Sequence, residues 1–372
     1  MTDLSERLAA LSPEQRRLLN SRMRQRTAED ATADSAPVAL RHSLYFFASA
    51  RAMRPDAYYR FVCEASALAD RAGLHAVWLP ERHFVDFGGL TPNPAVLASA
   101  VAAGTERIGI RAGSVAAPLH HPVRIAEDWS MVDQISGGRA GLSFASGWHP
   151  DDFVLARTPH AERRDTTLRA IDQVRAHWRG TPVSYPTTAG GDVEVRTRPE
   201  PVQPELPVWL TAAGSPTTFE AAGRAGVGVM TGLLGGPLEV LSENIRHYRA
   251  AWREAGHPGE GDVVVMVHSH VSAREDLEGF LRPAMHGYLR DFRRQTGTTE
   301  EDGDVLLESA YLNFLGGSSL LGTPAKARSV LRRLADAGAD EVGHLIDFGL
   351  PAPDVLAALP ELFALSAEEQ DR

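Results

Sequence analysis

Cysteine, long apolar runs and excess positive charge are all scarce in this chain of 372 residues. Its single cysteine, Cys63, excludes an intrachain disulfide framework and a zinc site built from thiolates. No stretch approaches the ~18 consecutive apolar residues of a membrane span. The first residues contain no apolar segment of the kind found in secretory signals. These absences predict a cytoplasmic protein that does not act at a membrane.

Lysine is almost missing, since Lys326 is the only lysine among 38 basic residues. Arginine is therefore abundant along the whole chain, and its presence alone does not indicate phosphate binding. The 48 acidic residues give a formal net charge of −10, which disfavours a nucleic acid partner. Hydrophobic residues at 43% and charged residues at 23% are typical of a folded globular protein and exclude a disordered or fibrous chain.

Residues 1–36 are predicted to form an N-terminal helical extension followed by a linker. Ser12-Pro13 begins a helix that runs to about Arg26, because serine caps a helix and proline fits its first turn. The stretch from Thr27 to Ala36 is polar and small, as in a linker. Two interpretations remain open: a solvated leader helix, or a helix that docks a partner or a second copy.

Residues 37–372 alternate between predicted strands and helices, which favours a parallel sheet. Eight strands favour a closed (β/α)8 TIM barrel of the α/β class over an open sheet. Two insertions interrupt the pattern: a hairpin near 180–204, and a helical segment near 274–320 with a glycine-rich loop at 316–319. The predicted strands are 42–48, 76–79, 107–112, 139–145, 208–211, 228–231, 263–271 and 341–347.

Small, hydroxyl and histidine side chains gather just after several of these strands. In a TIM barrel this end of the strands carries the active site. The segment Ala213–Thr218 also begins a helix, whose free N–H groups favour an anion such as phosphate. An ordinary Ser-Pro helix cap is the alternative for that segment. No Walker sequence and no GxGxxG fingerprint is present, which argues against a Rossmann site.

We expect no metal centre among the histidines. His83, His120, His121 and His149 follow predicted strands, but no HxH pair follows the first strand. The one HxH pair, at 268–270, lies on the seventh strand without a suitable set of partners. A GxSxG elbow is absent, so a serine triad is not predicted. An acid–base barrel without a cofactor is kept as an alternative.

Trp148 and Trp209 are predicted to pack within the barrel rather than to stack on a ligand.

The same segments resemble the bacterial luciferase-like monooxygenases, most closely the subgroup associated with nonribosomal peptide and polyketide assembly lines. The resemblance spans about residues 43–350 and implies a (β/α)8 barrel that binds reduced FMN and activates O2. It rests on AVWLPERHF at 76–84, RAGSV at 111–115, PLHHPVR at 118–124, GLSFASGWHP at 141–150, AGSPTTF at 213–219, GTP at 322–324 and LIDFG at 345–349.

By this resemblance, the FMN phosphate would bind at a helix start and beside an arginine. Ser114, in the bend after the third strand, would lie under the isoalloxazine ring, where relatives often have a cis non-prolyl peptide bond. Ser146 and Thr231 would line the edge of the flavin. The implied phosphate-binding residues are Ala213, Gly214, Ser215, Thr217 and Arg163.

The resemblance implies catalytic roles for His83, Arg82 and His149. Our hypothesis is that His83 or Arg82 donates a hydrogen bond to the oxygen that the flavin activates, since an imidazole can supply a proton near neutral pH. The chain departs from its relatives at two places. A histidine common in relatives is replaced by Val85 or Asp86, and a polar position after Thr231 is Gly232.

The implied partners are a substrate, free or tethered to a carrier protein, and a separate NAD(P)H:FMN reductase that supplies reduced FMN. Residues 1–26 would help to dock the carrier or a partner enzyme. The oligomeric state stays open between a monomer and a homodimer, the latter being common among relatives. Two alternatives stay open. One is a deazaflavin-dependent hydride-transfer enzyme on the same barrel, and the other is a barrel that binds partners without catalysis.

Overall fold

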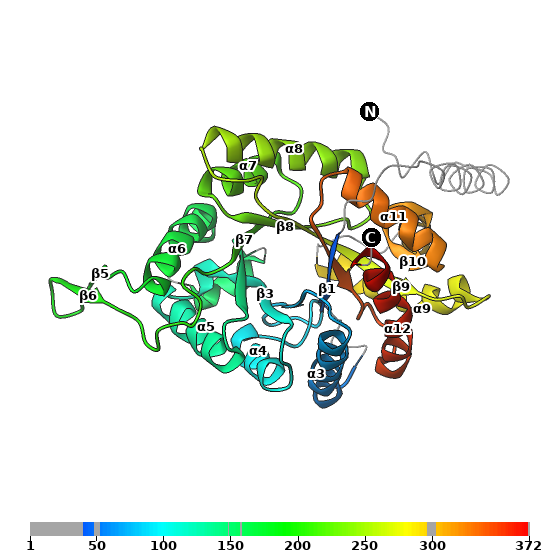
Figure 1. The fold of residues 1–372 in the computed structure, drawn as a ribbon, viewed down its shortest axis with the longest axis horizontal. Coiled ribbons are helices and arrows are strands. Elements are labelled where there is room, and N and C mark those ends of the chain that lie inside the picture. Colours follow the sequence, from blue (N-terminus) through cyan, green and yellow to red (C-terminus); the bar gives the residue numbers. More distant parts are fainter. Residues whose placement is uncertain (1–39, 48–52, 148, 157, 296–302, 371–372) are drawn as a thin grey trace.

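The computed structural model describes residues 40–47, 53–147, 149–156, 158–295 and 303–370. The predicted N-terminal extension lies outside these residues. Eight parallel strands close into a barrel in the order β9-β11-β1-β2-β3-β4-β7-β8, and β8 pairs back with β9 (Figure 1). The predicted (β/α)8 barrel is therefore confirmed. Its strands are β1 (Arg41–Tyr45), β2 (Ala76–Leu79), β3 (Gly109–Ala116), β4 (Ala140–Ala145), β7 (Val208–Thr211), β8 (Gly228–Gly232), β9 (Val263–Val271) and β11 (Glu341–Leu345).

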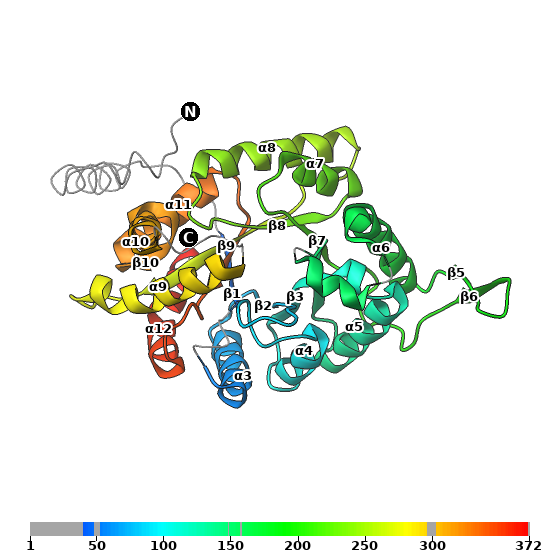
Figure 2. The ribbon, with the colours of Figure 1, turned by 180° about the vertical axis from the view of Figure 1, so that it is seen from behind.

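Helices surround the barrel in both views (Figures 1 and 2). Several begin with proline in the first turn and a capping side chain before it. Asn93 accepts hydrogen bonds from the N–H groups of Ala95 and Val96, and Thr323 accepts one from Lys326. The helices of the ring are α3 (Pro55–Arg71), α4 (Pro94–Ala103), α5 (Pro122–Ser136), α6 (Arg163–Trp178), α7 (Pro216–Ala225), α8 (Leu238–Glu254), α11 (Pro324–Asp336) and α12 (Ala352–Gln370). No described helix is both long enough and apolar enough to cross a membrane.

Both insertions are present. The first is an antiparallel hairpin of β5 (Val183–Pro186) and β6 (Asp192–Val195), which projects sideways from the ring beyond α5 and α6 (Figure 1). The second contains α9 (Leu277–Gln295), α10 (Gly303–Asn313) and a short β10 (Leu320–Gly322) that pairs with β9. The loop predicted at 316–319 is largely a π-helical turn, Phe314–Ser318, and β10 was not predicted.

Aromatic and charged side chains fill the barrel at the N-terminal ends of the strands. The indole rings of Trp78 and Trp209 meet edge to face at 5.1 Å, and the Arg111 guanidinium lies 4.5 Å from the Trp209 ring. Glycine is required on β8, because a Cβ at Gly228 would come within 2.2 Å of Trp209. Trp209 is therefore a packing residue, as predicted, whereas Trp148 lies outside the described residues.

Candidate active site

The predicted site residues lie where the barrel strands end. We call this end of the barrel, with the segments that directly follow the strands, the upper rim. His83 follows β2, Ser146 and His149 follow β4, and Ala213 follows β7. Because all eight barrel strands are parallel, these segments share one end of the barrel.

The start of α7 exposes backbone and hydroxyl groups of four residues, which we call the α7 cradle (Ala213, Gly214, Ser215 and Thr217). Gly214 has a φ of +104°, a conformation that glycine adopts without strain, and Ser215 precedes the helix. The Ser215 hydroxyl bonds to the Thr217 hydroxyl at 2.8 Å and makes no capping bond to the helix. The first N–H groups of α7 are thus left without a side-chain cap and can bind an anion.

Arg163 is the first residue of α6, the neighbour of α7 in the ring. Arg175 donates a hydrogen bond to the carbonyl of Ala225, which ties the ends of the two helices together. Helix α6 comes after strand β4 and helix α7 after strand β7, so both helices begin at the upper rim. Arg163 is half-buried and bonds through Nη1 to the carbonyl of His160 at 3.0 Å. It therefore lies at the same end of the barrel as the α7 cradle.

Ser114 lies inside β3 and not in a bend after it, because β3 continues to Ala116. The predicted cis peptide bond is present between Gly113 and Ser114, where the register with β4 shifts. The Ser114 hydroxyl is hydrogen-bonded to the Thr211 hydroxyl of β7. Thr211 in turn bonds to the hydroxyl of Ser143 at 2.7 Å. The Thr211 hydroxyl of β7 therefore links the hydroxyls of Ser114 on β3 and Ser143 on β4.

Ser146 is half-buried just beyond β4. Thr231, in contrast, supports the segment that leads to the α7 cradle. Side chains alternate along a strand, and a Cβ at Gly232 would meet Met266 within the barrel. The neighbouring Thr231 therefore faces the opposite side of β8. Its hydroxyl donates a 2.8 Å hydrogen bond to the carbonyl of Ala212, directly before the α7 cradle.

Arg82 is buried and holds the loop after β2. Its Nε donates to the carbonyl of Phe87 at 3.2 Å, and its Nη1 lies 3.5 Å from Oδ2 of Asp152. Burial lowers the Arg82 pKa to about 10, and the charge of Asp152 opposes this change. Burial likewise raises the pKa of Asp152, although Arg82 partly offsets it. Oδ1 of Asp152 is buried and has no hydrogen-bond partner among the described residues.

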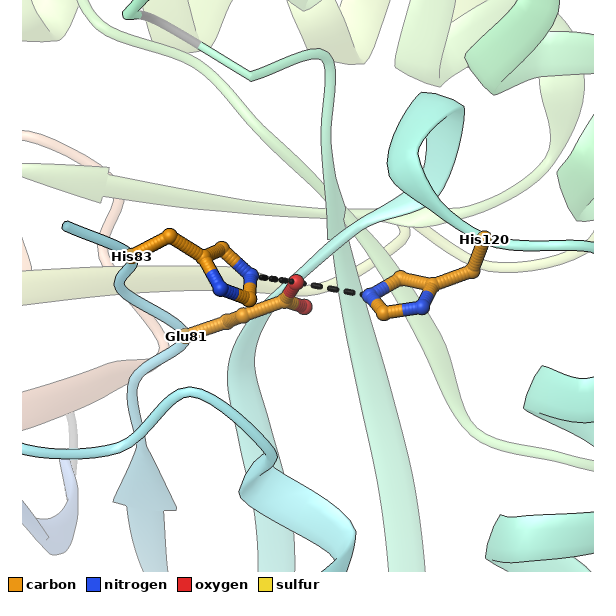
Figure 3. A group of neighbouring side chains, drawn as sticks. All are labelled: Glu81, His83 and His120. Atoms are coloured by element: carbon orange, nitrogen blue, oxygen red, sulfur yellow. Dashed lines mark hydrogen bonds and ion pairs between the residues drawn. The ribbon is translucent and has the colours of Figure 1, made fainter. Parts of the chain in front are cut away.

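The most tightly organised group on the upper rim is Glu81 with two histidines (Figure 3). Oε1 of Glu81 lies 2.9 Å from Nε2 of His83 and 2.7 Å from Nε2 of His120. Its other oxygen accepts the N–H of Ala116 at 2.9 Å. Burial alone would raise the Glu81 pKa, but the hydrogen bonds from His120 and His83 outweigh it and the pKa is lowered. Burial would lower the His120 pKa, yet Glu81 raises it overall.

These three side chains are hydrogen-bonded rather than arranged as metal ligands. Their nitrogen and oxygen atoms lie within 4.8 Å of one another, which invites comparison with a zinc site. In a tetrahedral zinc site with bonds of ~2.0–2.1 Å, neighbouring ligand atoms lie about 3.3 Å apart. The distances of 2.7 and 2.9 Å are shorter, and the oxygen lies between the two nitrogens (Figure 3). Direct hydrogen bonds account for this geometry.

The remaining histidines have other surroundings. His149 is half-buried, and its Nδ1 accepts the N–H of Asp151 at 3.3 Å, capping a short 3-10 helix, Pro150–Leu155. His268 is fully buried on β9, and burial lowers its pKa to about 3. Neither of its ring nitrogens has a partner among the described residues. His268 and His270 thus do not converge with the Glu81 group.

Sequence reasoning assigned no site role to Glu81, Asp152 or Thr211, and it considered His120 only as a metal ligand. Glu81 and His120 stood within the quoted stretches but received no role of their own. The one available signal was that Glu81 precedes His83 by two residues after a strand. The contact between Glu81 and His120 across the rim depends on how β2 and β3 pair, which no local pattern reveals.

Comparison with known proteins agrees with this fold. The flavin-dependent trigonelline monooxygenase oxygenase component of Acinetobacter baylyi is 26% identical over 227 residues, 59% of this chain and 61% of that protein. The monooxygenase RslO1 of Streptomyces bottropensis has a TM-score of 0.75 at 23% identity and covers 87% of this chain and 98% of its own.

Two further solved structures carry different cofactors. The oxygenating component of 3,6-diketocamphane monooxygenase of Pseudomonas putida, in complex with FMN, has a TM-score of 0.68 at 19% identity, with 89% and 99% of the two chains covered. An F420-dependent secondary alcohol dehydrogenase has a TM-score of 0.67 at 16% identity, covering 88% and 99%. At these low identities, the TM-scores establish that the fold is shared and do not extend to function. The sequence model of the luciferase-like monooxygenase family matches residues 41–341, and the chain belongs to this family.

Proposed function

We propose that the protein is a monooxygenase that uses reduced FMN and O2 to oxygenate an intermediate of natural-product biosynthesis. The observation that carries the proposal is the pairing, on one rim, of an uncapped helix start with a buried acid–histidine group. The first fits the phosphate of a flavin mononucleotide, and the second fits proton handling beside it. Membership of the luciferase-like monooxygenase family supports reading this pairing as part of a monooxygenase site.

The residues of the α7 cradle suit a phosphate. Ser215 and Thr217 can each donate a hydroxyl hydrogen bond, and the helix N-terminus favours negative charge. Arg163 would add a charge-assisted hydrogen bond from the neighbouring helix. Asn244 donates to the carbonyl of Gly214 at 3.1 Å and keeps the turn in place. We assign the phosphate of FMN to this cradle.

FMN, when bound, supplies two electrons and the atom at which O2 is activated. The overall reaction balances as reduced FMN, O2 and substrate giving FMN, oxygenated substrate and water. His83 has its Nε2 held by Glu81, so its Nδ1 is the ring nitrogen that would exchange a proton with a bound reactant. We place Ser114 and Ser146 beside the flavin ring, and His149 with Arg82 near the reacting oxygen.

Reduced FMN has to reach this rim from elsewhere, so a separate NAD(P)H:FMN reductase is part of the proposal. The trigonelline enzyme that this chain resembles is named as an oxygenase component, which is consistent with a two-component system. We further propose that the substrate is carried on a carrier protein and that residues 1–36 form a docking extension of the 37–372 barrel. Removing residues 1–36 should weaken turnover of a carrier-bound substrate and leave turnover of its free analogue unchanged.

The decisive experiment supplies the purified protein with FMN, a general reductase, NADH and O2, together with candidate carrier-bound acyl substrates. Intact-protein mass should show a gain of one oxygen that depends on FMN. The F420 alternative, favoured by the shared fold with the alcohol dehydrogenase, predicts instead tight binding of deazaflavin and oxidation without oxygen gain. Absence of binding to either flavin would support a non-catalytic barrel and would refute the proposal.

A further inference from the structure

Glu81 is shared by two histidines that come from different segments of the rim. His83 follows β2, whereas His120 follows the 3-10 turn Ala117–Leu119 after β3. Both Nε2 atoms donate to one and the same oxygen, Oε1. The side chain of Glu81 is 1% exposed, that of His83 is 9% exposed and that of His120 is 32% exposed. A single buried carboxylate thus connects an enclosed imidazole with one that reaches solvent.

We propose that Glu81 couples the protonation of His83 to that of His120, so that only one of the two imidazoles carries a positive charge at a time. His120 is then a positioning residue that sets the charge of His83. One carboxylate compensates one imidazolium, and a second positive charge against the same oxygen is repelled by the first. This inference rests on the proposed function only for its consequence in catalysis.

The tautomers follow from the hydrogen bonds. Since Oε1 accepts from both Nε2 atoms, each neutral ring carries its hydrogen on Nε2 and leaves Nδ1 as the free lone pair. With His120 protonated, His83 stays neutral and its Nδ1 can accept a hydrogen bond. With His120 neutral, His83 can be protonated, and its Nδ1–H can donate a hydrogen bond to an oxygen acceptor. His120 thereby selects between an acceptor and a donor at the same position.

Other charged groups face this group and belong to the same equilibrium. Asp128 on α5 acts on His120, where its negative charge raises the pKa. Asp152, on the turn Pro150–Leu155, interacts with His83 and is itself paired with Arg82. His149 also acts on Asp152. These groups remain in place in the variants below, so that differences between variants report the coupling through Glu81.

The test is a histidine NMR titration of the full chain without flavin. In His120→Asn the His83 midpoint should rise by about one pH unit, the size at which two sites titrate as a pair. In Glu81→Gln the midpoints of both histidines should fall, because their counter-charge is lost. His121→Asn is the matched control, since His121 packs on the Tyr185 ring and should leave the His83 midpoint unchanged.

An unchanged His83 midpoint in His120→Asn would overturn the proposal, as would a rise in Glu81→Gln. Because the titration uses the protein without flavin, this result does not depend on monooxygenase activity. With flavin, reductase and substrate, the pH at which product formation gives way to hydrogen peroxide release should shift in His120→Asn in the same direction as the NMR midpoint. FMN affinity should not change. A shift in affinity instead of in the pH profile would reveal a merely structural role.

Discussion

Arg111 of β3 and Glu341 of β11 form a buried ion pair across the base of the barrel. Nη1 of Arg111 lies 3.1 Å from Oε1 and 2.9 Å from Oε2 of Glu341. Glu341 also accepts hydrogen bonds from Ser43 and from the indole of Trp78. Burial alone would raise the Glu341 pKa, but the charge of Arg111 lowers it overall. The pair connects strands that are far apart in sequence, at the end of the barrel opposite the upper rim.

Replacing Arg111 with methionine should destabilise the fold strongly, because Glu341 would keep a buried charge without its main partner. Removal of one member of a buried pair costs about 3–5 kcal/mol. Adding Glu341→Gln should recover much of this loss, since glutamine can still accept from Ser43 and Trp78 without a charge. Urea unfolding of the single and double variants measures both effects. Equal stability of the two variants would contradict this account.

Arg163→Ala should weaken FMN binding about tenfold, which corresponds to the ~1.5 kcal/mol of a hydrogen bond to a charged group. Arg164→Ala, its exposed neighbour on α6, is the matched control and should bind FMN normally. Riboflavin lacks the phosphate, so its affinity should be the same in both variants. Quenching of flavin fluorescence measures all four affinities. A parallel loss of riboflavin affinity in Arg163→Ala would place Arg163 elsewhere than at the phosphate.

Local patterns predicted the eight barrel strands and the hairpin at 180–204, because strand and helix periods are properties of short segments. The pairing register between neighbouring strands was harder to predict from the sequence. β3 was predicted to end at Ala112, whereas it runs to Ala116. The glycine and serine at 113–114 read as a turn, yet pairing with β4 continues past them through a register shift. Ser114 was therefore placed in the wrong element, because it lies inside β3.

Contacts between segments explain the other omissions. His83 was singled out from its sequence context, but its connection through Glu81 to His120 requires β2 and β3 to lie side by side. Likewise Arg82 was predicted, as the alternative to His83, to donate a hydrogen bond to the activated oxygen. Its guanidinium is committed to Phe87 and Asp152, and this was not visible because Asp152 lies about seventy residues later in the chain.

His83→Ala should retain FMN affinity, lose oxygenated product and release more hydrogen peroxide. The physical reason is that an imidazole at this position is a suitable proton donor for oxygen transfer. The ratio of product to hydrogen peroxide per NADH consumed is the measurement. His247→Ala, an exposed histidine on α8, should keep the parent ratio. If His83→Ala leaves the ratio unchanged, His83 has no part in oxygen transfer.

Lys326 should make folding stability depend on pH in the alkaline range. Its amine is buried, donates to the carbonyl of Leu321 at 2.7 Å, and has its pKa lowered by burial to about 8. An unfolded lysine has a pKa of about 10.4, so between these values the unfolded chain binds more protons and this group makes stability rise with pH. The penalty for burying the charged amine is complete below about pH 8.

Lys326→Met keeps the apolar stem and removes the charge. The variant should therefore be more stable than the parent at pH 7, and this advantage should shrink steadily as the pH rises from 8 to about 10. Urea unfolding of both proteins at several pH values gives the difference directly, and titrations common to both proteins cancel in it. A difference that stays constant over this range would show that Lys326 has an ordinary pKa in the folded protein.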